Sequence, residues 1–345
     1  WTRDGAESDG GEEGLFVKHG VKRTSGSYWT AEQMAAAVPR SQEVELEGGA
    51  WGSTTWAVST AAAGCDLSTT DLDERKEYRD PPFIAVGRLF FTMANGSYSC
   101  SASVGQTRYV WTAGHCLYSP EEALFAEDVI FVPGYYEGSN TEGRYHGENI
   151  YIPPEWRNGR LSHDYAVIEV HADVQDGVDG IAFPIQTNME QESTVFESCG
   201  YPAEAPFDGE ELHVCEGMWC VNDPVRPRGV MGIPCDSNGG SSGGPWLITQ
   251  PDGTWTIASV NSYGYFGDPD PDGDVMYGPR FDDDTVAFFE GITAGTTPPD
   301  ATDEYTFYST PMWIGLFCFT AIAILATIAG VAYGLSTRRS GYETV

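Results

Sequence analysis

Short runs of apolar residues between Pro82 and about Ile292 predict a domain built from many β-strands. The runs are apolar throughout or alternate with polar positions, as in Val129–Val132 and Tyr165–Val170, and Gly, Pro, Asn and Asp residues separate them. Regularly spaced short strands are typical of an all-β protein made of a sandwich or a pair of barrels. The amphipathic run Asp284–Gly291 predicts a short helix that closes the domain.

The pattern changes on both sides of this domain. Residues 1–81 are rich in Gly, Ser, Glu and Asp and predict an extended, partly ordered N-terminal extension. Its one helix-compatible patch is Thr30–Val38, where Thr30 and Gln33 have the spacing of a capping box. Residues 293–311 are rich in Thr, Pro and Asp without apolar periodicity, which predicts a stalk.

The run Met312–Leu335 contains 24 residues without a charge, and this length predicts a transmembrane helix. Arg338 and Arg339 follow the run, whereas its N-terminal flank is acidic. By the positive-inside rule, we expect residues 336–345 in the cytoplasm and the β-rich domain outside, as a single-pass cell-surface protein. Small residues spaced by four, which let helices approach closely, predict a helix–helix partner through Ala326, Gly330 and Gly334.

Composition narrows the function classes. The chain has 51 Asp and Glu residues against 18 Lys and Arg residues, a formal charge of −33, which repels nucleic acid and excludes it as a partner. This acidity fits either solubility in high salt or a genome that disfavours lysine codons. Because the sequence begins at Trp1 without a hydrophobic leader, we expect a mature form whose signal peptide has been removed.

The cysteines and acidic loops bear on redox compartment and metals. Eight cysteines without a paired Cys-x-x-Cys spacing fit an oxidising compartment and predict no zinc site. The run Asp268–Asp274 resembles the first half of a calcium loop, but Pro279 stands where the bidentate glutamate would be. A solvated acidic loop is the alternative that we adopt, so we expect no metal and no cofactor.

Three separate segments offer the groups of a nucleophilic site. Ser242 lies in a glycine-rich turn, His115 lies beside Cys116, and Asp164 opens a strand-like run. Serine is a poor nucleophile at neutral pH unless a base takes its proton, and that base must itself be oriented by a third group. The neighbouring Ser241 is the alternative nucleophile.

In the order His115, Asp164, Ser242, these segments resemble a serine peptidase of the chymotrypsin/trypsin fold. The similarity is greatest to the secreted bacterial branch with the glutamyl endopeptidases and the actinobacterial trypsin-like peptidases, and Trp29–Met34 resembles their segment before the barrels. It implies two antiparallel six-stranded β-barrels with the site in the crevice between them. The matching motifs are Val86–Thr92, Cys100–Ser103, Thr112–Cys116, His163–Ala166, Gly200–Pro202 and Gly239–Trp246.

The resemblance implies a role for each of these residues. His115 would be the general base, Asp164 would fix its tautomer, and Ser242 would attack the carbonyl carbon. The backbone N–H groups of Gly240 and Ser242 would form the oxyanion hole, where a side chain at position 240 would obstruct the substrate oxygen. Ser241 occupies the position of the aspartate that pairs with a new N-terminus in animal trypsins, so activation through that ion pair is not expected.

The resemblance also implies disulfides Cys100–Cys116 and Cys215–Cys235. Cys199 with Cys220 is a further suggested pair, which leaves Cys65 without an assignment and Cys318 in the predicted transmembrane helix.

The resemblance also implies a specificity pocket that includes Asp236, Asn261, Ser262 and Gly264. Asp236 at a pocket floor favours Arg or Lys, and Asn261 replaces the histidine of glutamate-specific members. We therefore expect a basic or a small residue on the acyl side of the cut bond.

These observations predict a membrane-anchored extracytoplasmic serine endopeptidase that acts on polypeptides through an acyl-enzyme. The alternative is a catalytically silent surface or assembly protein that uses the same fold as an interaction scaffold. An open cleft with a hydrogen-bonded Ser242–His115 pair would favour the enzyme, whereas a cleft blocked by the extension would favour the scaffold.

Overall fold

A computed structural model describes most of the β-rich domain and parts of the extension. The described residues are 15–24, 29–43, 80–94, 96–138, 143–187, 189–191, 193–223, 228–265 and 275–295. The predicted transmembrane run 312–335, the tail 336–345, the acidic run 268–274 and Cys65 lie outside them. Within the described ranges, no helix is both long and apolar enough to cross a bilayer.

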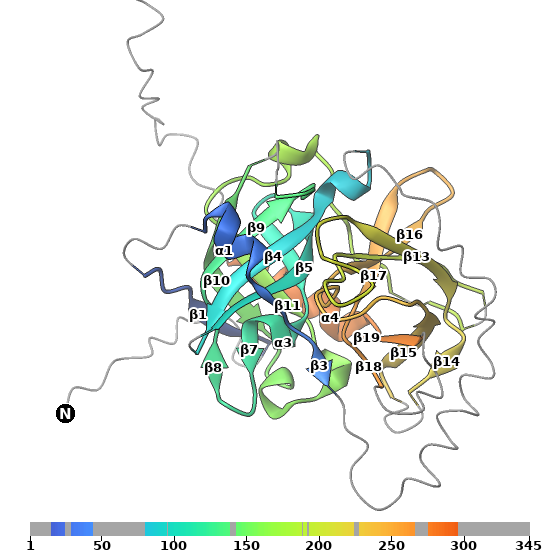
Figure 1. Cartoon of the computed structure of the whole chain (residues 1–345). Coiled ribbons are helices and arrows are strands. Elements are labelled where there is room, and N and C mark those ends of the chain that lie inside the picture. Colours follow the sequence, from blue (N-terminus) through green and yellow to red (C-terminus); the bar gives the residue numbers. More distant parts are fainter. Residues whose placement is uncertain are drawn as a thin grey trace, which may run out of the picture. The chain divides into compact units, whose positions relative to one another are not determined.

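The first half of the domain is a closed barrel of six strands, as predicted (Figure 1). Its strands are antiparallel, and the pairing of β10 with β9 closes the ring. Every residue of β11 is buried, because both faces of the strand contact other parts of the fold. In the order in which they pair around the barrel, the strands are β10 (Tyr145–Ile152), β11 (Ala166–Val170), β6 (Tyr109–Thr112), β5 (Gly96–Gln106), β4 (Val86–Met93) and β9 (Glu127–Pro133).

The second half consists of two sheets rather than one continuous ring of six strands. A four-stranded sheet contains β13 (His213–Met218), β12 (Val195–Gly200), β16 (Pro245–Thr249) and β17 (Trp255–Val260). A five-stranded sheet contains β14 (Val221–Asn222), β15 (Val230–Pro234), β19 (Val275–Pro279), β18 (Tyr263–Gly264) and β3 (Gln42–Glu43). The last of these strands comes from the N-terminal extension and pairs with β18 in parallel.

Short elements connect the strands. They are η2 (Phe83–Ala85), α3 (Gly114–Leu117), β7 (Tyr118–Ser119), β8 (Leu124–Phe125), η3 (Trp156–Asn158), η4 (Leu161–His163) and η5 (Asp176–Val178). The predicted closing helix is present as α4 (Asp283–Ala294), and the Asp282 side chain caps it by accepting from the backbone N–H groups of residues 284 and 285. Phe289 of α4 packs on Trp111 with ring centroids 5.0 Å apart, so the end of the second half rests on the first barrel.

The described parts of the extension are integrated into the domain. Strand β1 (Val17–Gly20) pairs with β10, helix α1 (Ala31–Ala35) carries the expected capping box at Thr30, and β2 (Val38–Pro39) pairs with β5. Trp29 and Met34 are buried in the main core, and the Trp29 indole N–H donates to the Asp128 carbonyl at 2.7 Å. The extension therefore contributes core residues to the first barrel.

A buried ion pair joins the two halves and gives a stability prediction. Arg88 on β4 is 2% exposed, lies 3.2 Å from Glu210 and donates to the Ser99 hydroxyl at 3.0 Å. We expect Arg88→Ala to lower the free energy of unfolding by about 3 kcal/mol, because it leaves a partly buried carboxylate without its partner. Chemical denaturation measures this loss.

An exposed ion pair provides the control. Lys22 pairs with Glu127 at 3.6 Å, and the two side chains are 72% and 44% exposed. Lys22→Ala should therefore cost about 1 kcal/mol or less. Equal losses for the two variants would contradict a structural role specific to Arg88.

Candidate active site

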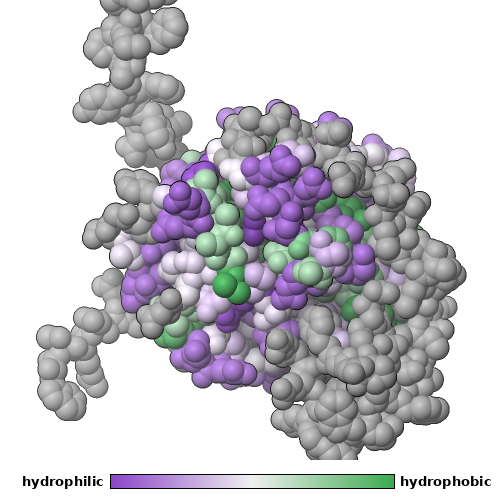
Figure 2. Space-filling view, in the orientation of Figure 1, coloured by the Kyte–Doolittle hydropathy of each residue, from purple (hydrophilic) through white to green (hydrophobic). Residues whose placement is uncertain are grey.

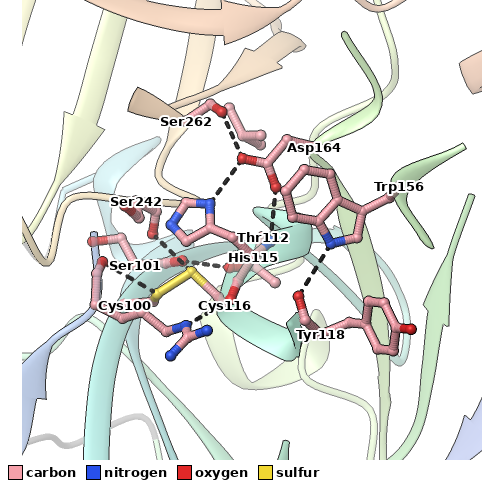
Figure 3. A network of polar contacts seen from close by, with 12 residues as sticks. Cys100, Ser101, Thr112, His115, Cys116, Tyr118, Trp156, Asp164, Ser242 and Ser262 are labelled. Carbon is pink, nitrogen blue, oxygen red and sulfur yellow. Dashed lines mark hydrogen bonds and ion pairs between the residues drawn. A yellow bond between two sulfur atoms is a disulfide. The ribbon is translucent and has the colours of Figure 1, made fainter. Parts of the chain in front are cut away.

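His115 lies in α3, the single helical turn that follows β6. The side chain is 1% exposed, and the next residue, Cys116, is bridged to Cys100 on β5 with an S–S distance of 2.01 Å (Figure 3). A Cβ at Gly114 would come within 2.7 Å of the Trp156 ring, so glycine is required for this turn to pack. The disulfide and the tight packing fix the histidine against the first barrel.

Asp164 orients the imidazole through two hydrogen bonds. This carboxylate is fully buried after η4; its Oδ1 accepts from the His115 backbone N–H at 2.7 Å and its Oδ2 lies 2.8 Å from His115 Nδ1. The Ser262 hydroxyl also donates to Oδ2, at 2.6 Å (Figure 3). An ionised carboxylate only accepts, so Nδ1 carries the proton and Nε2 keeps its lone pair for use as a base.

Ser262 therefore has a role that the sequence reasoning missed. Ser262 is one of the residues expected in the specificity pocket, and it does line the recess beside Ser242. Its hydroxyl, however, fixes the aspartate. No local motif signals this contact, because the two residues lie 98 positions apart in the chain.

The serine turn is held by the first barrel. The Ser242 carbonyl accepts from the backbone N–H of Ser101 on β5 at 2.8 Å. Gly243 has φ +83°, and a Cβ there would lie 2.1 Å from the Thr112 hydroxyl, so only glycine fits between the turn and β6. The Ser241 hydroxyl donates to the Asn238 carbonyl at 2.7 Å, which occupies it and leaves Ser242 as the nucleophile.

The catalytic serine and histidine are not hydrogen-bonded to each other in this conformation. His115 Nε2 is buried and has no hydrogen-bond partner among the described residues. Catalytic hydrogen bonds of this kind are often long or poorly aligned before substrate binds, so the gap does not remove His115 as the base.

Gly240 has the geometry of an oxyanion-hole residue. Its φ is +97°, and a Cβ would lie 2.8 Å from the Tyr201 carbonyl, so a side chain is excluded. Its carbonyl accepts from the Ser101 hydroxyl at 2.9 Å, which fixes the orientation of the peptide unit. Among described residues, the N–H groups of Gly240 and Ser242 donate to no backbone carbonyl, so both are available to a substrate oxygen.

Gly240→Ala should lower kcat by about 10²–10³, the usual cost of losing one oxyanion-hole donor. The strained φ and the contact with Tyr201 would turn the peptide unit away. Steady-state kinetics on a peptide ester measures the change. Gly253→Ala is the control, since that glycine also has positive φ (+84°) but lies in open surroundings. Similar kinetic losses for both variants would contradict the assignment.

The recess beside the serine contains two of the four expected pocket residues. Asn261 is buried and its Oδ1 accepts from Ser198 and from the Trp246 indole, so it serves the core. Asp236 is not among the lining residues; it pairs with His213 at 2.8 Å. The described lining residues are Ser41, Gln42, Ser237, Asn238, Gly239, Ser241, Ser242, Ser262, Tyr263, Gly264 and Met276.

Both disulfides implied by the resemblance are present. Cys215 and Cys235 are joined at 2.09 Å, beside the His213–Asp236 pair. The suggested Cys199–Cys220 bridge is wrong. Cys220 does form a disulfide, but Cys199 is not its partner, since its thiol donates to a backbone carbonyl two residues away. Cys199 lies in β12 and is fully buried in the main core.

Two clusters bring histidine, cysteine or aspartate close enough to suggest a metal. They are Cys100 with His115 and Cys116, and His213 with Cys215 and Asp236. In each cluster every cysteine belongs to a disulfide, so its sulfur is not a thiolate ligand. These described clusters therefore do not supply the donor set of a metal centre.

A nucleophile, an oriented base and two N–H donors available in the serine turn, on a two-part β-fold, define the class of serine peptidases with a trypsin-like fold. The trypsin family model matches residues 84–275, more than half of the chain, and the chain belongs to this family.

Solved structures show the same fold. The chain is 36% identical to the thermostable serine protease AL20 from an extremophilic microorganism, with a TM-score of 0.55 over 62% of this chain and 98% of that one. It is 33% identical to the protease Anisep from Arthrobacter nicotinovorans, with a TM-score of 0.55 over 63% and 98%.

Curated relatives are more distant. The chain is 28% identical over 147 residues to a glutamyl endopeptidase of Bacillus licheniformis, covering 43% of this chain and 44% of that protein. It is 23% identical over 188 residues to a Bacillus subtilis protein named extracellular metalloprotease, covering 53% and 57%. The chain thus spans about half the length of the curated relatives it matches.

Proposed function

We propose that this protein is a serine endopeptidase that cleaves polypeptides through an acyl-enzyme. The observation that carries the proposal is the placement of Asp164. One carboxylate holds both the backbone and the ring of His115, and so leaves Nε2 to act as the base. Ser242 and the two oxyanion-hole N–H groups lie in the adjoining turn of the second half.

The reaction follows from these groups. Ser242 Oγ attacks the substrate carbonyl carbon while its proton passes to His115 Nε2, and Asp164 stabilises the imidazolium that forms. The oxyanion is held by the N–H groups of Gly240 and Ser242. When the C–N bond breaks, His115 gives the proton to the leaving amine. Water, activated by the same histidine, then attacks the ester and releases the acid.

An activity probe tests this assignment directly. A fluorophosphonate is expected to label Ser242, as identified by mass spectrometry of the labelled peptide, and His115→Ala is expected to abolish labelling. His163→Ala is the matched control, because that histidine contacts the Ser162 hydroxyl and not the site. If neither the intact chain nor a variant with Gln42→Pro and Glu43→Pro, which frees the cleft from the N-terminal extension, is labelled, the peptidase assignment is wrong.

For the acyl side of the cut bond, we propose a small or a basic residue. Asp236 is the sequence neighbour of the lining residue Ser237 but does not itself line the recess, and His213 engages one of its oxygens. This pairing makes a small side chain the first expectation. A peptide-library cleavage profile tests it, and a dominant preference for glutamate would contradict it.

We also propose that the domain is held outside the cell by one C-terminal helix. Support comes from the uncharged run Met312–Leu335 and the arginines that follow it. The full chain should then remain in the membrane fraction after a carbonate wash. Ile322→Arg combined with Leu325→Arg should release it, since each arginine costs about 2.5–3.5 kcal/mol at the helix centre. Recovery of the unaltered chain in the soluble fraction would contradict the anchor.

A second candidate is favoured by a specific observation. The extension crosses the cleft, and the serine and histidine are not hydrogen-bonded, which is the arrangement expected of an interaction scaffold. The intact triad and the available oxyanion N–H groups support the enzyme instead. The labelling experiment separates the two candidates.

A further inference from the structure

We propose that residues Val38–Glu43, which we call the strap, are a built-in inhibitor that occupies the substrate-binding edge of the active site. This inference rests on the proposed peptidase function. The strap runs from the first barrel, past the catalytic histidine, to the strand that follows Ser262 (Figure 1). It thereby holds the enzyme in a latent state.

The first part of the strap binds the histidine side of the cleft. Strand β2 pairs in parallel with β5, and the backbone N–H of Arg40 donates to the Ser99 carbonyl at 2.9 Å. The Arg40 side chain reaches further in, because its Nε donates to the carbonyl of His115 at 2.7 Å. The strap thus contacts the backbone of the catalytic base itself.

The second part covers the edge of the other sheet. Gln42 pairs with Tyr263, and Glu43 pairs with Gly264, in parallel register. Without this pairing, β18 would be an edge strand directly after Ser262. Such an edge binds an extended peptide by adding it as a further strand, so the strap and a peptide substrate compete for the same backbone groups.

The strap also forms part of the wall of the recess next to the nucleophile. Ser41 and Gln42 line that recess together with Ser242 and Ser262. With the strap in place the recess has a volume of about 20 Å³. This is room for roughly one water molecule, so a substrate side chain would enter it once the strap has moved away.

The strap does not lie in the position of a peptide about to be cut. Among the described residues, no strap carbonyl accepts from the N–H of Gly240 or Ser242, so none lies in the oxyanion hole. The surface in this view is a mixture of hydrophilic and hydrophobic residues where it is coloured (Figure 2). Val38, at the start of the strap, is 56% exposed.

Anchors upstream keep the strap in register. Met34 is 1% exposed, and the Trp29 carbonyl accepts from the Arg144 guanidinium at 2.8 Å. Burial lowers the pKa of the Arg40 guanidinium, an effect that Tyr98 and Glu122 partly offset. These contacts hold the N-terminal end of the strap while its far end rests on β18.

The test compares labelling rates of Ser242 in full-length variants. Gln42→Pro combined with Glu43→Pro removes both backbone donors of β3, so pairing with β18 is lost. We expect this opened variant to react with the fluorophosphonate at least about tenfold faster than the unaltered chain, and to hydrolyse a peptide ester faster by the same factor. A tenfold change corresponds to the free energy of roughly one net hydrogen bond. Arg40→Ala with Gln42→Ala is a second opened variant that retains the backbone donors.

Controls separate the strap from the peptidase assignment. Glu32→Ala lies on the exposed face of α1 and should leave the rate unchanged. A peptide with the sequence of residues 37–43 should restore slow labelling to an opened variant, whereas a scrambled peptide should not. If all forms were labelled equally fast, the proposal that the strap inhibits the enzyme would be wrong, whereas the peptidase assignment would stand. If no folded form were labelled, both the peptidase assignment and the inhibitory strap would be wrong.

Discussion

Ser242→Ala is expected to lower kcat for peptide hydrolysis by about 10⁶-fold, the largest effect of any single change in this protein. The reason is that no other side chain takes over the attack, because the neighbouring Ser241 hydroxyl is engaged with the Asn238 carbonyl. The measurement is steady-state hydrolysis of a peptide in the Gln42→Pro, Glu43→Pro background, where the cleft is open. KM should change little, since the serine oxygen contributes mainly to the transition state.

Ser241→Ala is the control for this experiment. It removes one hydrogen bond inside the turn, so the expected loss is about tenfold or less. If Ser241→Ala were the variant that abolished turnover and probe labelling, the nucleophile assignment would be wrong. Circular dichroism and melting temperature of both variants check that neither effect comes from unfolding.

Asp164→Asn is expected to lower kcat by about 10⁴-fold. Asparagine fits the same space and can still accept from the His115 backbone N–H, but its amide group donates to Nδ1 and favours the wrong imidazole tautomer. Labelling by the fluorophosphonate should slow in parallel. Because a misplaced proton is the cause, part of the activity should return as pH rises and hydroxide competes as the base.

Asp128→Asn provides the matched control for a buried aspartate. Asp128 accepts from the backbone and hydroxyl of Thr24, both at 2.7 Å, in the extension and away from the catalytic groups. Its replacement should lower stability and leave kcat within a fewfold range. A large loss of kcat in both variants would show that the Asp164 effect is not specific to the histidine.

A local motif surrounds each candidate catalytic residue, and for this reason the sequence could propose them. The order His115, Asp164, Ser242 and the glycines around the serine indicated a nucleophile, its base and an oxyanion hole. Glycine was expected at position 240 because a side chain would obstruct the substrate oxygen, and in the structure the positive φ and the nearby Tyr201 carbonyl also exclude a side chain. The short apolar runs predicted an all-β protein, whereas the six-stranded barrel was implied by the resemblance to the trypsin fold.

The pocket could not be predicted in the same way. His213 faces Asp236 across 23 positions of sequence, and nothing near either residue signals that contact. Asn261 lies beside Ser262 in sequence, but its amide points into the core. Neighbouring residues on a short extended segment alternate between faces, so sequence proximity to the site did not determine which side chain lines it.

The extension shows a related limit. Its composition predicted a partly ordered segment, and the helix cap at Thr30 was correct. What composition could not reveal is that a two-residue strand, β3, would find its partner more than 200 positions away. Such pairings are set by the tertiary fold rather than by local propensity.

The strap lies on the same chain as the site that it covers, and residues 44–79 join the two covalently. A tethered inhibitor acts at an effective concentration that reaches the millimolar range for short flexible linkers, and it does not weaken when the protein is diluted. A single cut between residues 43 and 80 would leave the strap held from one end only, by Trp29, Met34 and β1, which stay in the first barrel. The far end of the strap would then be a free chain end, so the cut enzyme would gain activity while its activity would still not depend on dilution.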